Sequence, residues 1–149
     1  MIEGATYRCM ADIDAKLQLV PELKGKIVHV YNKSDLLDKA KGIVLPFAGI
    51  FYNGISANSG GGETHRIGNA CVLRISVMIL TRIDTLSSAN MQQLSGKLLD
   101  SARNEIFESI SPLGHYWNFT GENAEIVKDV VVYVQQWQTP FTLSKIERI

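Results

Sequence analysis

The chain has 149 residues, of which 46% are hydrophobic and 20% charged, so it has the balance of a globular protein and not of a disordered or fibrous one. Fifteen Lys and Arg residues offset fifteen Asp and Glu residues, which gives no support to sequence-specific or other nucleic-acid binding. No apolar run approaches the roughly 20 residues of a membrane helix, and Cys9 and Cys71 lack metal-ligand spacing, so we expect synthesis in a reducing cytoplasm without a membrane partner.

The N-terminal third predicts two helical segments around a strand. Apolar residues recur every three or four positions over 10–20, which predicts a helix that Pro21 ends and a flexible N-terminus over 1–9. The β-branched and aromatic run at 26–31 predicts a strand. Residues 32–41 are charged around two leucines and predict a short helix or helical turn.

The middle of the chain predicts two strands and a long loop. Residues 42–54 read as a strand, in which Pro46 indicates an edge position or a bulge because it cannot donate a ladder hydrogen bond. Gly, Ser and Asn gather over 53–63, a composition typical of a flexible hairpin loop. The alternating run at 71–83 predicts the longest strand, roughly 40 Å, with one face on the core and the other available to a partner.

The C-terminal half predicts a long helix and a closing strand. An apolar stripe predicts a helix over 88–110, with Ser87 as its N-cap and Pro112 after its end. We expect a turn at 121–123, a strand over 126–137 that Pro140 closes, and a tail over 141–149. The predicted fold class is α+β, a mostly antiparallel sheet of about four strands packed by one long and one shorter helix, in a single domain over 1–149.

No side-chain pattern predicts catalysis or ligand binding. His29, His65 and His115 are scattered without metal-ligand spacing, and the Gly60 to Gly62 run lacks the phosphate-loop pattern. Cys71 lies in an apolar strand, where a thiol is usually a small buried hydrophobe. We therefore expect no catalytic residue, no cofactor and no metal, and the chain is not predicted to be an enzyme.

Two segments are predicted to contact other proteins. The Gly-rich loop has too little apolar area to order itself but can order on contact with a neighbour. The aromatic cluster after the long helix is either a binding platform or a seal for the end of the sheet, and the sequence favours neither reading. The predicted interface residues are Asn53, Gly54, Ser59, Gly60, Gly61, Gly62, Glu63, Tyr116, Trp117 and Phe119.

Three stretches of the chain, taken together, carry a resemblance. The first is an opening helix that leads through a glycine into a strand, the second a strand that leads to a Gly-rich loop, and the third an aromatic segment before the closing strand. Their residues are Ile13, Leu17, Pro21, Leu23, Gly25 and Val28–Val30; Pro46–Ile50; and Trp117–Glu122. This layout resembles the tail terminator, or tail-completion, proteins of tailed bacteriophages and their relatives in Mu-like contractile-tailed phages.

The resemblance implies an assembly role without chemistry. Such a protomer assembles in the host cytoplasm into a ring, commonly a hexamer, that caps the tail tube of the virion. The implied partners are further copies of the chain, the tail tube protein and a neck or head-completion protein, with the sheath protein as a further candidate. The alternatives are a head-side neck or connector protein and a small intracellular ligand-binding module or enzyme.

Overall fold

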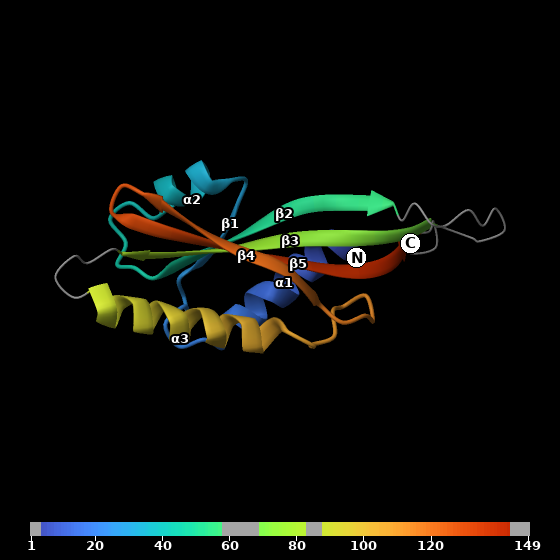
Figure 1. Cartoon of the computed structure of the whole chain (residues 1–149). Coiled ribbons are helices and arrows are strands. Elements are labelled where there is room, and N and C mark those ends of the chain that lie inside the picture. Colours follow the sequence, from blue (N-terminus) through green and yellow to red (C-terminus); the bar gives the residue numbers. More distant parts are fainter. Residues whose placement is uncertain (1–3, 58–68, 83–87, 144–149) are drawn as a thin grey trace.

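The computed structural model describes residues 4–57, 69–82 and 88–143, which contain five strands and three helices (Figure 1). In chain order they are α1 (Ala5–Leu17), β1 (Ile27–Val30), α2 (Lys33–Lys39), β2 (Phe47–Ala57), β3 (Asn69–Arg82), α3 (Ser88–Ile106), β4 (Asn118–Val127) and β5 (Val130–Leu143). The predicted α+β class is confirmed, with one more strand than the four or so expected. Three helices pack on the sheet, where the predicted class counted one long and one shorter helix. No helix in these ranges combines the length and the apolar character that crossing a membrane requires.

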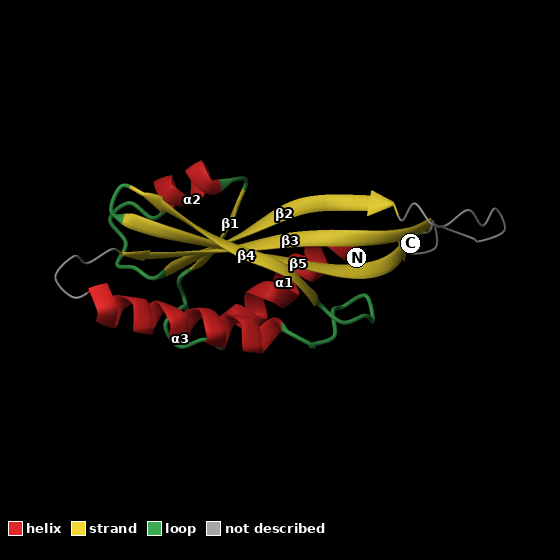
Figure 2. Ribbon diagram, viewed as in Figure 1, coloured by secondary structure: helices red, strands yellow, loops and turns green. Residues whose placement is uncertain are grey.

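The strands form one sheet in the order β1-β2-β3-β5-β4 (Figure 2). β1 runs parallel to β2, and every other neighbouring pair is antiparallel, so the sheet is mostly antiparallel as predicted. β3 lies in the middle and pairs with β5 from Asn69 opposite Leu143 to Arg82 opposite Val130. A central strand is covered on both faces, which explains why its second face is also partly apolar.

The helices cover the two faces of the sheet unequally. α1 and α3 lie on one face and α2 on the other (Figure 1). The larger core cluster joins α1 and α3 to the side chains of Leu73, Ile75 and Val77 on β3. Met78 and Leu80 point the other way and pack in a smaller cluster beneath α2. The face of β3 predicted to be free for a partner is therefore partly covered by this chain's own α2.

α2 lies close to the sheet because β2 carries a glycine beneath it. A Cβ at Gly49 would lie 2.8 Å from Leu36 Cδ1 and 3.1 Å from Val30 Cγ2. Asn32 caps the helix, with its Oδ1 accepting a hydrogen bond of 2.8 Å from the Asp35 backbone N–H. The predicted short helix at 32–41 is thus confirmed as α2, and Leu36 is its buried anchor.

The prediction for the N-terminus is wrong at both ends of the first helix. α1 begins at Ala5, so residues 5–9 are helical, and Cys9 is buried with Ile13 and Leu17. The apolar stripe therefore starts one turn earlier than predicted, with cysteine as its first member. α1 ends at Leu17, ahead of Pro21, because the following residues close short turns, in which the N–H of Val20 donates to the carbonyl of Leu17.

The second strand differs from its prediction in start, length and irregularity. β2 begins after Pro46, which follows a cis peptide bond, and it lies between two strands and not at an edge. Its register shift falls between Tyr52 and Gly54. The predicted loop over 53–63 is wrong for its first part, since β2 continues to Ala57, and the rest of that loop lies outside the described residues.

The C-terminal prediction missed a strand. The expected turn at 121–123 lies inside β4, and the turn that joins β4 to β5 falls at 128–129, near the start of the predicted strand over 126–137. β5 continues past Pro140. β4 begins at Asn118, opposite Gln138, so beyond that point the edge of β5 that faces β4 has no strand partner, and a proline without an N–H is tolerated there. Residues 141–143 are thus strand and not tail, and 144–149 lie outside the described residues.

α3 confirms the predicted long helix but is shorter at its C-terminal end. It ends at Ile106 and not at residue 110, and Glu108, at φ 59°, takes the chain out of the helix before Pro112 is reached. The predicted N-cap, Ser87, lies outside the described residues.

Candidate functional site

The segment between α3 and β4 is held by hydrogen bonds to itself and to the sheet. The Trp117 N–H donates to the Ser109 carbonyl at 2.9 Å, and the Ser111 N–H donates to the His115 carbonyl at 2.7 Å. The Ser111 hydroxyl lies 2.8 Å from that of Thr139 on β5, and both residues are buried. The segment therefore presents its side chains in fixed positions, although it contains no long helix or strand.

Trp117 belongs to the core and not to the surface. Its side chain is 1% exposed, and its Nε1–H donates to Asp12 Oδ2 on α1 at 2.8 Å. Lys16 also binds the Asp12 carboxylate, so the indole N–H joins an ion pair within α1. Of the two readings of the aromatic cluster, Trp117 fits the seal for the end of the sheet. Its assignment to an interface between proteins stays a prediction.

Next to Trp117 the chain exposes three large apolar side chains, which we call the end patch: Phe107, Ile110 and Tyr116. They are 52%, 59% and 58% exposed. Ile110 and Tyr116 face each other in an isolated antiparallel bridge, which places their side chains next to one another. The predicted interface residue Tyr116 is thus at the surface beside Ile110, and Phe107 is exposed on the same connecting segment; the sequence prediction included neither.

Phe119 is intermediate between the two aromatic residues before it. It is 36% exposed, and its ring meets the buried ring of Trp137 edge to face, with centroids 5.1 Å apart. One side of Phe119 therefore closes the core, and the other is open to a partner.

Asn53, the first residue of the other predicted interface segment, lies on the opposite face of the sheet from the end patch. Its Nδ2 donates to Ser76 Oγ at 2.6 Å and to Gln136 Oε1 at 2.9 Å, which links β2, β3 and β5. Gly54 follows at φ 102°, in the register shift of β2. The described part of this segment is therefore polar strand surface, and Ser59, Gly60, Gly61, Gly62 and Glu63 lie outside the described residues.

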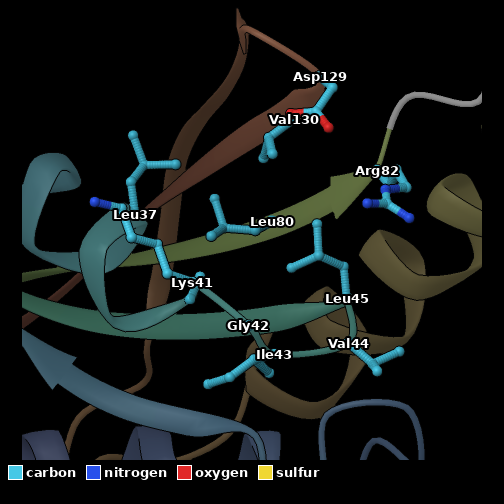
Figure 3. A pocket seen from close by; sticks show the side chains of 11 residues that line it. Leu37, Lys41, Gly42, Ile43, Val44, Leu45, Leu80, Arg82, Asp129 and Val130 are labelled. Atoms are coloured by element: carbon cyan, nitrogen blue, oxygen red, sulfur yellow. The ribbon is translucent and has the colours of Figure 1, made fainter.

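A groove that no sequence pattern predicts lies between the α2–β2 connection and the turn that joins β4 to β5 (Figure 3). It has a volume of about 590 Å³, and we call it the tip groove. Its apolar side chains come from four parts of the chain, and charged residues stand among them. The apolar lining includes Leu37, Ile43, Val44, Leu45, Leu80 and Val130, and the charged residues are Lys41, Arg82 and Asp129.

A second hollow of about 300 Å³ adjoins the tip groove and shares Lys41 and Asp129 with it. It adds Asp38 and Lys128 to the charged residues there. Lys41 Nζ lies 3.2 Å from Asp38 Oδ1, and both side chains are exposed. The pair Asp38 and Lys41 is distant in sequence from Lys128 and Asp129, so the fold brings the two groups together.

The buried polar groups on the α3 face support the fold. Arg103 on α3 donates to Glu122 on β4 at 2.6 Å, and Gln135 on β5 donates to the same Glu122 oxygen at 2.9 Å. Partial burial lowers the pKa of Arg103, but its hydrogen bonds to Glu122 and Asp100 outweigh this and raise the pKa overall. This network ties α3 to the β4–β5 pair and leaves the guanidinium fully charged.

Among the described residues, the remaining reactive groups show no activated chemistry. Burial, helped by the charge of Asp12, raises the pKa of the Cys9 thiol to about 12, so the thiol is protonated at neutral pH and is a poor nucleophile. His29 Nε2 lies 3.2 Å from Asp14 Oδ2 at an exposed position. Across the described ranges, no three potential metal ligands gather at one point. The expectation of no catalytic, cofactor or metal residue stays a prediction.

Comparison with known proteins gives a likeness of fold. No protein-family model matches the chain, and no curated protein sequence matches it. Among solved structures, it is similar to a chain in the virion of a native gene transfer agent (GTA) particle, with a TM-score of 0.54 and 9% sequence identity. The match covers 93% of this chain and 98% of that one. At 9% sequence identity, this match shows that the two chains share a fold and shows nothing beyond the fold.

Proposed function

We propose that this chain is a structural subunit of a phage-like particle and that it serves there as a tail terminator. In this role, copies of the chain form a ring, six in the arrangement that we favour, which caps the tail tube and joins the tail to the neck or head. The partners are the tube protein and a neck or head-completion protein, with the sheath protein as a further candidate.

The observation that carries the proposal is the end-to-end likeness to a chain of a gene transfer agent virion. Because 93% of this chain and 98% of that chain align, each consists almost entirely of the shared domain. The resemblance of the sequence to tail terminator proteins points to the same kind of particle, and it adds the position at the end of the tube.

The surface of the subunit also supports an assembly role. The end patch exposes three large apolar side chains on a segment held by hydrogen bonds, and the tip groove offers an apolar hollow elsewhere on the chain. Aromatic residues are enriched in the cores of protein interfaces, whereas exposed apolar clusters are costly on a protein that works alone.

Deletion of the gene from the phage or prophage that encodes it tests the proposal. Electron microscopy of the lysate should show heads without tails and free tails of uneven length, and a plasmid copy of the gene should restore complete particles. Unjoined heads with free tails of uniform length would instead indicate that the chain is a head-side connector protein. Particles of normal form and number would refute a structural role.

A further inference from the structure

We propose that the end patch of one copy docks into the tip groove of the next copy, so that the subunits associate head to tail. This inference rests on the proposed function, because it names the contact that would build the ring. It assigns a role to the groove, which the predicted interface residues do not include.

The two surfaces are unlike and lie apart on the subunit. The segment 107–117 that carries the end patch joins α3 to the start of β4, on the face of the sheet that α1 and α3 cover (Figure 1). The β4–β5 turn, which borders the tip groove, lies at the other end of β4. A contact between unlike surfaces leaves each copy with one free patch and one free groove. Such contacts continue from copy to copy until the rotation closes a ring.

The apolar character of the two surfaces matches. Phe107, Ile110 and Tyr116 are exposed at the surface, and the groove provides aliphatic walls from Ile43, Val44, Leu45 and Val130 (Figure 3). Its volume of about 590 Å³ lies within the usual range for sites that enclose a ligand of several side chains' size, about 300–1,000 Å³. Docking removes water from both surfaces, each of which is open to solvent in the separate subunit.

The charges around the two surfaces are opposite in sign. Glu105 and Glu108 stand within three residues of the end patch, and Lys16, whose Nζ lies 3.4 Å from the Ile110 carbonyl oxygen, is paired with Asp12. The two hollows at the tip carry three basic residues, Lys41, Arg82 and Lys128, against two acidic ones, Asp38 and Asp129. An acidic border on one copy therefore meets a net basic border on the next, which favours a second copy of this chain as the occupant.

The free edge of β4 is the competing surface for self-association. It carries a register shift between Phe119 and Gly121, and the charged side chain of Glu125 on this strand is exposed. Bulges and charges are the devices that keep edge strands from pairing with other chains. We therefore assign the contact to the patch and the groove.

Two single substitutions test the assignment without disturbing the core. Ile110→Arg places a positive charge on the end patch, and Val44→Asp places a negative charge at the groove, where the wild-type side chain is 77% exposed. Each should weaken self-association about tenfold or more, measured by mass photometry across a concentration series. Tyr31→Arg, at an exposed aromatic residue outside both surfaces, is the matched control and should associate like the wild type.

A mixture of the two variants distinguishes this contact from a symmetric one. The Val44→Asp chain retains an intact patch and the Ile110→Arg chain an intact groove, so an equal mixture should form a one-to-one dimer that grows no further. A symmetric contact through either surface alone would give no such dimer. Thermal melts by circular dichroism, equal for all four proteins, show that the variants are folded.

Three results would overturn the inference: a wild-type chain that is monomeric at every concentration, association that neither substitution weakens, or a mixture that contains no mixed dimer. The gene deletion reads out the proposed function separately. If the wild-type chain associates as expected but the gene deletion still yields normal particles, the proposed function is refuted while the contact between copies stands.

Discussion

Two adjacent aromatic residues, Tyr116 and Trp117, should respond in opposite ways to truncation. Trp117→Ala removes an indole that is almost completely buried, together with its hydrogen bond to Asp12. Truncation of a buried Trp costs about 3–5 kcal/mol, which includes the cavity left behind. Since domains of this size unfold at a cost of about 5–15 kcal/mol, this one change should remove a large part of the stability.

Tyr116→Ala is the matched control for this change. Its side chain is more than half exposed, so the free energy of unfolding should change by no more than about 0.5 kcal/mol, while self-association should weaken. Urea unfolding followed by far-ultraviolet circular dichroism measures both variants without relying on tryptophan fluorescence. A loss below about 1 kcal/mol for Trp117→Ala would refute the core placement and restore both residues to one surface platform.

Three further substitutions and one pH dependence follow from the packing. Gly49→Ala should cost about 1–3 kcal/mol in urea unfolding, because its Cβ would clash with Leu36, whereas Gly96→Ala in α3 meets no atom within 4 Å and should stabilise by about 0.5–1 kcal/mol. Leu98→Ala should cost about 2–5 kcal/mol and deplete the soluble protein, since this side chain of α3 is buried in the larger cluster. The unfolding free energy should fall as pH rises from about 8.5 to about 12, because the Cys9 thiol ionises in that window only in the unfolded chain; Cys9→Ala should lack this part of the slope.

Elements with a strong periodic pattern could be predicted from the sequence. β3 extends over 69–82 where 71–83 was expected, and α3 begins at the predicted residue. Both owe this to burial: each repeats apolar side chains at the period of its own backbone, and both pack against the same core.

The missed strand shows why exposure weakens such a prediction. β4 is an edge strand whose side chains are mostly exposed, so it has no alternation to detect, and Gly121 within it resembles a turn. The turn at Lys128 and Asp129 interrupts a long β-branched run and lacks the Asn-Gly or Asp-Gly pair that marks most tight hairpins. Lys128 adopts φ 58°, a backbone conformation that is uncommon for lysine and that its residue type does not predict.

The candidate surfaces were predictable only in part. The aromatic composition of 116–119 indicated a special segment, but successive residues point in different directions, and only packing decides that Trp117 is inside and Tyr116 outside. The tip groove combines residues from α2, β3 and β5, and no local pattern joins Leu37 to Leu80 or Val130.

Cryo-electron microscopy of purified particles from the encoding phage or prophage tests the central claim most directly. The claim predicts a closed ring of this chain at the end of the tail tube, next to the neck, with the end patch of each copy against the tip groove of its neighbour. Complete particles that lack the chain, or that hold it without a ring of copies, would contradict it.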